Sequence, residues 1–144
     1  MTIAVDFDGT IVEHRYPEIG EEIPFATDTL KQLIADRHKL ILWSVREGKL
    51  LDEAVEWYRK RGVEFWAVNK DYPEENGAQN NNHFSRKIKA DIFIDDRNIG
   101  GLPEWGLIYQ MICSGKSYRR VVKESMLTDL NQEPPKKKHW WSRK

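Results

Sequence analysis

The sequence predicts an α/β fold, a three-layer sandwich built around a parallel, Rossmann-like sheet. Short apolar runs of strand length recur along the chain, and they are Ile3–Val5, Lys39–Ser44, Phe65–Val68 and Ile92–Ile94. Segments with helical periodicity lie between the first three runs. Because strands joined by helices run parallel and are covered on both faces, this alternation favours a layered α/β domain. A chain of 144 residues is long enough to bury the core of one such domain.

The first strand ends in two acidic residues, Asp6 and Asp8, within the stretch Thr2–Thr10. Side chains two residues apart in an extended chain point to the same side, so these carboxylates can converge. Gly9 then permits a sharp turn of the backbone. Two close carboxylates repel each other unless a charge compensates, and Mg²⁺ is the natural partner. The alternative is a strand that ends in a solvated Asp-Gly turn.

A charged segment, Ile11–Glu22, follows this turn and contains Pro17, so we expect an irregular flap over the end of the first strand. A helix is predicted after Phe25, with Thr27 or Asp28 as its N-cap. Its apolar positions have the spacing of one helical face, and they are Leu30, Leu33 and Ile34.

Three more helices are predicted further along the chain. The second stops near Gly62 and buries Leu51, Ala54, Val55 and Tyr58. The third starts at Pro103 and buries Leu107, Ile108, Met111 and Ile112. A short amphipathic helix after residue 114 would use Tyr118, Val121, Val122, Met126, Leu127 and Leu130. A long polar loop, Asn69–Arg86, joins the third and fourth strands.

Polar residues follow each predicted strand at the point where it ends. They are Asp6 and Asp8, Ser44, Asn69, and Asp95 with Asp96. Ligands of open parallel sheets bind at the carboxyl ends of the strands, so this set predicts one binding site there. The alternative is that strand ends are polar simply because loops are polar.

Composition sets limits on location and partners. The formal net charge is zero, but the segment from Pro134 to Lys144 holds five Lys or Arg and no acidic residue. With its tryptophans this basic tail is compatible with nucleic acid, although disorder or packing on a second subunit is favoured. Cys113 is the single cysteine and is predicted to be a small buried hydrophobe. With no signal peptide and no membrane-spanning run, we expect a cytoplasmic protein without a membrane partner.

The run Asp6-Phe7-Asp8-Gly9-Thr10 after an apolar strand resembles the first motif of the haloacid dehalogenase (HAD) superfamily, most of whose members are phosphohydrolases. The resemblance implies that Asp6 is the nucleophile that forms an aspartyl-phosphate, and that Asp8 is the general acid and base. Ser44 matches the second motif, a hydroxyl that donates to a phosphoryl oxygen. Asp95 and Asp96 match the fourth. It further implies a Mg²⁺ site formed by Asp6, Asp8, Asp95 and Asp96, to which Asp8 contributes its backbone carbonyl oxygen.

The third motif is a lysine, for which Lys87 is the first choice and Lys89 the second. The predicted substrate-binding residues are Thr10, Arg46 and Asn69. For Arg46, an ordinary surface arginine is the alternative.

The resemblance covers about residues 1–112 and leads to a HAD-like catalytic domain over residues 1–113 with a C-terminal extension over residues 114–144. Neither inserted segment has room for a large cap domain, so the site should be open unless a loop or a second subunit of a homo-oligomer covers it. We expect the Asn69–Arg86 loop to set substrate choice.

The function expected from this resemblance is Mg²⁺-dependent hydrolysis of a small phosphate monoester, such as a sugar phosphate. The alternatives are a phosphatase acting on a nucleotide or a nucleic-acid end, and a HAD-like module that binds phosphoryl groups or signals without catalysis. A receiver domain is disfavoured because its acid pair follows the first strand, whereas here the pair Asp95–Asp96 comes last.

Overall fold

The computed structural model describes residues 1–76 and 85–130. The chain divides into two compact units, Met1–Tyr109 and Gln110–Lys144. The division falls inside helix α3 (Trp105–Ser114), a few residues before the boundary expected from the sequence. The basic tail and the centre of the polar loop lie outside the described residues.

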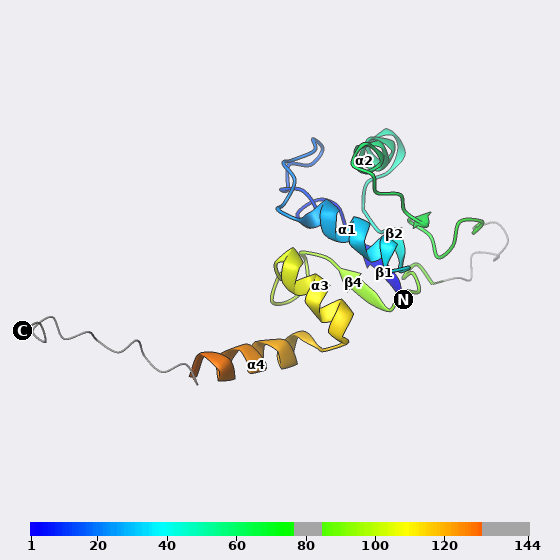
Figure 1. Ribbon diagram of the computed structural model, residues 1–144. Helices are drawn as coiled ribbons and strands as arrows, with labels where there is room; N and C mark the ends of the chain where they lie inside the picture. Colours follow the sequence, from blue (N-terminus) through cyan, green and yellow to red (C-terminus); the bar gives the residue numbers. More distant parts are fainter. Residues whose placement is uncertain (77–84, 131–144) are drawn as a thin grey trace, which may run out of the picture. The chain divides into compact units, whose positions relative to one another are not determined.

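A parallel four-stranded sheet forms the centre of the first unit (Figure 1). Its strands are β1 (Thr2–Val5), β2 (Lys39–Leu42), β3 (Ala67–Val68) and β4 (Ile92–Ile94). Their order is β3-β2-β1-β4, so β1 lies between β2 and β4 and its carboxyl end is flanked by theirs. The predicted parallel, Rossmann-like α/β fold without a large cap domain is confirmed.

The helices are α1 (Ala26–Ala35), α2 (Gly48–Lys60), α3 and α4 (Tyr118–Leu130). The predicted N-caps of α1 are wrong. Phe25 precedes the helix with a left-handed backbone (φ 66°) and makes no side-chain cap. Thr27 lies inside the first turn, where its hydroxyl donates to the carboxylate of Glu22 instead. The predicted amphipathic helix after residue 114 is confirmed as α4.

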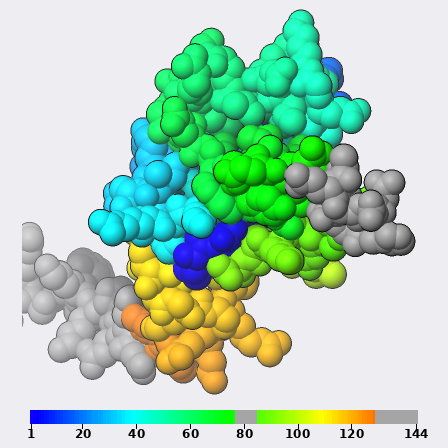
Figure 2. Space-filling model, turned by 90° about the vertical axis from the view of Figure 1, so that its right-hand side faces the viewer, coloured from blue at the N-terminus to red at the C-terminus, as the bar shows by residue number. Residues whose placement is uncertain are grey.

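The strand register divides the apolar side chains between two faces of the sheet. Ala4 pairs with Ile41 and Phe93, and Ile41 pairs with Ala67, so these four share one face. With Ile88 they form a cluster to which no residue of a helix belongs. In Figure 1 the chain that follows β3 runs on the side of the sheet away from α1. Figure 2 views the molecule from that side. Among the described residues, loop segments therefore cover this face.

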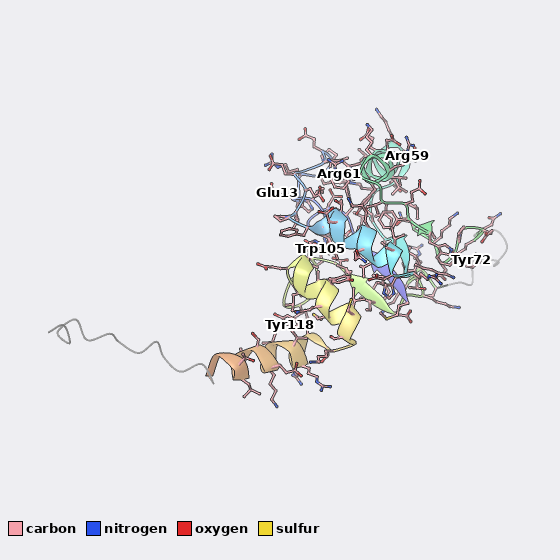
Figure 3. The ribbon with its side chains drawn as sticks, in the orientation of Figure 1. Glu13, Arg59, Arg61, Tyr72, Trp105 and Tyr118 are labelled. Atoms are coloured by element: carbon pink, nitrogen blue, oxygen red, sulfur yellow. The ribbon has the colours of Figure 1, made fainter. Side chains whose placement is uncertain are left out.

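Trp105 joins the start of α3 to the turn after β1. Its side chain is buried, and its indole N–H donates to the carbonyl oxygen of Thr10 at 3.1 Å (Figure 3). Tyr109 donates from its hydroxyl to the Asp36 carboxylate at the end of α1, at 2.8 Å. Trp105 thus fixes the start of α3 to the turn after β1, which leads into the site, and Tyr109 fixes the helix to the end of α1.

Cys113 is exposed, which contradicts the predicted burial. The buried residues Trp105 and Ile108 are three apart on one face of α3, and position 113 falls away from that face because of the helical period. Among the described residues, no helix is both long and apolar enough to cross a membrane.

Candidate functional site

Three carboxylates meet where β1 and β4 end. The backbone N–H of Asp6 donates to the carbonyl oxygen of Ile94 at 3.0 Å, which continues the ladder and brings Asp6 beside Asp95 and Asp96. One carboxylate oxygen of each acid lies within 4.8 Å of the other two. Three of the four predicted metal ligands are therefore brought together. The Asp8 carboxylate is not part of this cluster; the ligand expected from Asp8 is its backbone carbonyl oxygen, which a cluster of side chains does not test.

The three acids of the cluster repel one another. The pKa of Asp6 is raised to about 6, mainly because the carboxyl is buried. The Phe7 backbone N–H acts in the opposite direction, and the charges of Asp95, Asp96 and Asp8 add to the rise. A bound cation would relieve this repulsion.

Thr10 connects the two strand ends. Its buried hydroxyl accepts from the backbone N–H of Asp96 at 3.0 Å and lies 3.5 Å from an Asp6 oxygen. Gly9 makes this approach possible, because a Cβ built there would lie 2.4 Å from an Asp96 oxygen. Its φ of 85° also favours glycine. Thr10, predicted to bind substrate, therefore braces the acid cluster in this structure.

Ser44 and Asn69 come from the ends of β2 and β3. The Asn69 side-chain oxygen accepts from the Ser44 backbone N–H at 2.8 Å, and its amide lies 3.4 Å from the Arg46 carbonyl oxygen. Ser44 lines the pocket described below, while its hydroxyl accepts from the Arg46 backbone N–H at 3.1 Å. Asn69 is not among the lining residues. Its contacts hold the loop that presents Ser44.

Asp8 is paired with Arg46. The guanidinium donates two hydrogen bonds of 2.7 Å, one to each oxygen of the Asp8 carboxylate. Only 1% of the Arg46 surface is exposed, although a surface arginine was the alternative to a substrate ligand. The hydrogen bonds to Asp8 raise the pKa of Arg46 above its ordinary value. Arg46 does not line the pocket, so binding substrate as predicted would require it to leave Asp8.

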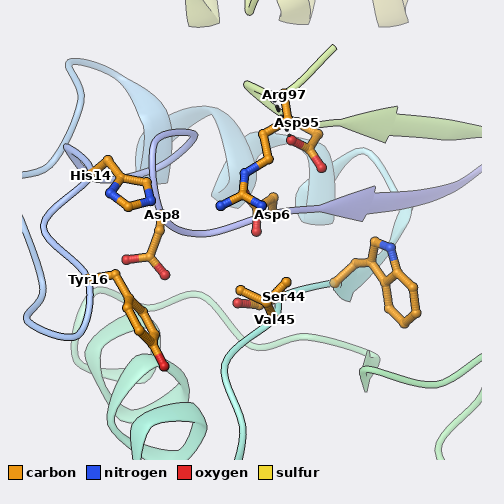
Figure 4. Close-up of a pocket in the computed structure, with 9 residues that line it drawn as sticks. Asp6, Asp8, His14, Tyr16, Ser44, Val45, Asp95 and Arg97 are labelled. Carbon is orange, nitrogen blue, oxygen red and sulfur yellow. Dashed lines mark hydrogen bonds between the residues drawn. The ribbon is translucent and has the colours of Figure 1, made fainter.

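A pocket of about 550 Å³ opens over these strand ends (Figure 4). Figure 4 shows His14 and Tyr16 on the side of Asp8, and Arg97 with Asp95 on the side of Asp6. The pocket is lined by Asp6, Asp8, His14, Tyr16, Trp43, Ser44, Val45, Asp95 and Arg97. The flap thus contributes His14 and Tyr16 to the pocket, and none of the described residues of the Asn69–Arg86 loop lines it.

The pocket lacks the predicted lysines and contains an arginine that the sequence analysis did not select. The ammonium of Lys87 lies 5.3 Å from the centre of the Phe93 ring, and neither Lys87 nor Lys89 lines the pocket. Arg97 does line it, and its backbone N–H donates to the Asp95 carboxylate at 2.8 Å. Its position directly after Asp95–Asp96 was the signal that could have identified it.

Comparison with known proteins gives one informative relationship. No family model matches the chain, and no curated protein matches it. A solved structure from Bacteroides thetaiotaomicron, titled "Structure of the conserved protein coded by locus", is 67% identical. The match covers 84% of this chain and 96% of that one, with a TM-score of 0.77. This chain therefore belongs to the same family as that conserved Bacteroides thetaiotaomicron protein.

Proposed function

We propose that this protein is a Mg²⁺-dependent phosphohydrolase of the HAD type that uses Asp6 as its nucleophile on a small phosphate monoester, such as a sugar phosphate. The observation that carries the proposal is the convergence of Asp6, Asp95 and Asp96 at the carboxyl edge of the sheet, beside a pocket that also contains the motif-two residue Ser44.

The donor set fits a hard divalent cation. Carboxylate oxygens are the ligands that Mg²⁺ takes from proteins, usually one or two per site together with water and substrate oxygens. Asp6 and Asp95 would hold the ion, with Asp96 oriented by Thr10 beside them. When bound, Mg²⁺ would neutralise charge on the carboxylates and on the phosphoryl oxygens.

The protein's own residues would carry out the displacement. With Asp8 in its protonated form, an Asp6 oxygen attacks phosphorus, the bond from phosphorus to the ester oxygen breaks, and that oxygen leaves with the Asp8 proton. Water then attacks the phosphorus of the aspartyl-phosphate, gives a proton to Asp8, and releases phosphate with Asp6 restored. Ser44 would donate to a phosphoryl oxygen, and Arg97 would add positive charge at the pocket wall.

Asp8 would need a partial change of partner for this chemistry. Both of its oxygens accept from Arg46, and a carboxyl that donates a proton needs one oxygen free. We expect the substrate's ester oxygen to take the place of one of the two Arg46 contacts.

A second candidate substrate class is favoured by the pocket wall. Tyr16 is 47% exposed at the pocket, and Trp43 and Arg97 also line it. Aromatic rings and guanidinium groups stack on bases, so a nucleotide or the phosphorylated end of a nucleic acid is the alternative substrate.

The test is a phosphatase screen over sugar phosphates, nucleotides and oligonucleotides phosphorylated at either end, with Mg²⁺ or with chelator. Asp6→Asn protein is the matched control, since it keeps the shape of the side chain. Phosphate release that persists unchanged with chelator, or in folded Asp6→Asn, would overturn the proposal. Activity confined to nucleotides or oligonucleotides would select the second candidate.

A further inference from the structure

The tip of the flap, residues 14–20, is a closed loop at the mouth of the pocket. Its neck is fixed by a hydrogen bond from the Glu13 backbone N–H to the Glu21 carbonyl oxygen at 2.8 Å. Gly20 lies tightly against the neck, because a Cβ there would be 2.1 Å from the Glu13 carbonyl oxygen. The tip carries His14 and Tyr16, which line the pocket.

One side chain fastens this tip. Arg46 donates to the carbonyl oxygen of Pro17 at 3.0 Å and to that of Glu18 at 2.9 Å. Among the hydrogen bonds of the described residues, these are the two that join residues 14–20 to a residue outside the flap. The guanidinium also lies 5.3 Å from the centre of the Tyr16 ring, so it is held between the flap and the Phe7 ring at 5.2 Å.

The same guanidinium holds Asp8. Its two bonds to Asp8 and its two bonds to the flap use four of the five N–H donors that arginine has. A planar group with donors along two edges can bind a carboxylate on one side and carbonyl oxygens on the other, which lysine cannot reproduce. Flap position and Asp8 orientation therefore depend on one buried group.

We propose that Arg46 is a positioning residue that couples the flap to Asp8, so that the wall facing the leaving group and the acid–base group are set together. The inference about the leaving group rests on the proposed phosphohydrolase function, whereas the fastening of the flap does not.

The experiment compares Arg46→Lys with Arg59→Lys. Arg59 makes the same kind of two-bond pair with Glu56, at 2.8 and 2.9 Å, but on the exposed side of α2 (Figure 3). Amide hydrogen exchange of the whole chain is the first measurement. The amides to follow are those of Glu13 and Ile23 at the base of the flap, whose N–H groups donate to the Glu21 and Ile11 carbonyl oxygens. We expect Arg46→Lys to raise their exchange by roughly tenfold or more, since the loss of hydrogen bonds to a charged group loosens the flap that they close. Arg59→Lys should leave those residues unchanged.

A second variant keeps the inference testable if the Arg46→Lys protein does not fold. Tyr16→Leu removes only the ring beside the guanidinium, at an exposed position, and should raise exchange of the same residues by a smaller factor. If the Glu13 and Ile23 amides exchange at the parent rate in every folded variant, the inference is overturned. A rise spread evenly over the domain would also overturn it, because it would indicate only lower global stability.

The kinetic measurement separates positioning from a structural contribution. With a phosphate monoester identified by the screen, Arg46→Lys should raise KM more for bulky esters than for small ones and should lower kcat for both. A purely structural loss would lower kcat by the same factor for bulky and small esters. It would also leave the ratio of their KM values unchanged, and this result would contradict the coupling. If the parent enzyme releases no phosphate, the proposed function fails, while the exchange measurement still decides whether Arg46 fastens the flap.

Discussion

Asp6 and Asp8 stand two residues apart at the end of the same strand, yet their surroundings are opposite. Asp6 faces Asp95 and Asp96, and its pKa is raised to about 6. Asp8 faces a buried guanidinium that satisfies both of its oxygens. The site is thus divided into an acidic half, where we propose that a cation binds, and a half in which Arg46 balances the charge of Asp8. Unequal environments of this kind assign different tasks to two carboxylates.

The largest expected effect comes from removing the charge of Asp6. Asp6→Asn should reduce phosphate-ester hydrolysis to background, because an amide does not attack phosphorus in place of the carboxylate. Steady-state phosphate release with Mg²⁺ is the measurement, and circular dichroism checks the fold. Substantial turnover by well-folded Asp6→Asn protein would exclude the aspartyl-phosphate route.

The next effect comes from the neutralised half. Asp8→Asn should slow alkyl phosphates by about 10²–10⁴-fold and aryl phosphates much less, because a good leaving group needs little protonation. The measurement is kcat/KM for one ester of each kind. Equal losses on both esters would show that Asp8 has a different role.

Stability provides a separate check on that half. Asp8→Ala leaves the Arg46 charge buried without its carboxylate, which should lower the free energy of unfolding by about 3–5 kcal/mol. Urea denaturation measures it, with Glu56→Ala as the control because the exposed Arg59 pair should contribute little. A similarly small loss for both variants would mean that the buried pair is easily rearranged.

Metal affinity tests the acidic half. Asp95→Asn should raise the Mg²⁺ concentration needed for half-maximal rate by roughly ten- to a hundredfold, as the loss of a coordinating or supporting carboxylate does. A Mg²⁺ titration of the initial rate measures the shift, and chelator should abolish the parent activity. If the parent enzyme works at full rate in chelator, the acid cluster does not bind a Mg²⁺ ion that the reaction needs.

The pH dependence of stability should differ between parent and Asp6→Asn protein without metal. The folded-state pKa of Asp6 is above its ordinary value of 3.8, so the folded state holds that proton more tightly than the unfolded state. This contribution to stability is present below pH 3.8 and is lost as the pH rises to about 6. Asparagine does not ionise in this range, so Asp6→Asn avoids the fall in stability that comes with ionisation of Asp6. The variant should therefore stabilise the metal-free protein at pH 7.5 but not at pH 3.5. Denaturation curves at both pH values with chelator test the sign, and saturating Mg²⁺ should reduce the difference.

The fold and the acid cluster were predictable because they depend on local patterns. Apolar runs that end in Asp6, Ser44 and Asp95 define strands and the edge where ligands bind. The register of a parallel sheet then places these strand ends side by side. The partner of Asp8 was not predictable in the same way. Arg46 is 38 residues away, and whether its guanidinium faces solvent, substrate or a carboxylate depends on the path of the flap. The predicted burial of Cys113 was wrong for a similar reason, since apolar neighbours do not determine the helix face on which a residue lies.

The smallest expected effect decides which cation serves the phosphoryl group. The sequence favours Lys87 as this cation, whereas the pocket contains Arg97. Replacing each of the two by glutamine distinguishes between them. Arg97→Gln should raise KM for a phosphate monoester several-fold with a smaller change in kcat, because a partly solvated guanidinium at the pocket wall contributes to binding more than to the displacement. Lys87→Gln should change neither constant if its ammonium stays beside the Phe93 ring. The reverse result, a collapse of kcat in Lys87→Gln with Arg97→Gln unaffected, would place Lys87 at the phosphoryl group. It would also mean that Lys87 moves when substrate binds, because its side chain does not line the pocket in this structure.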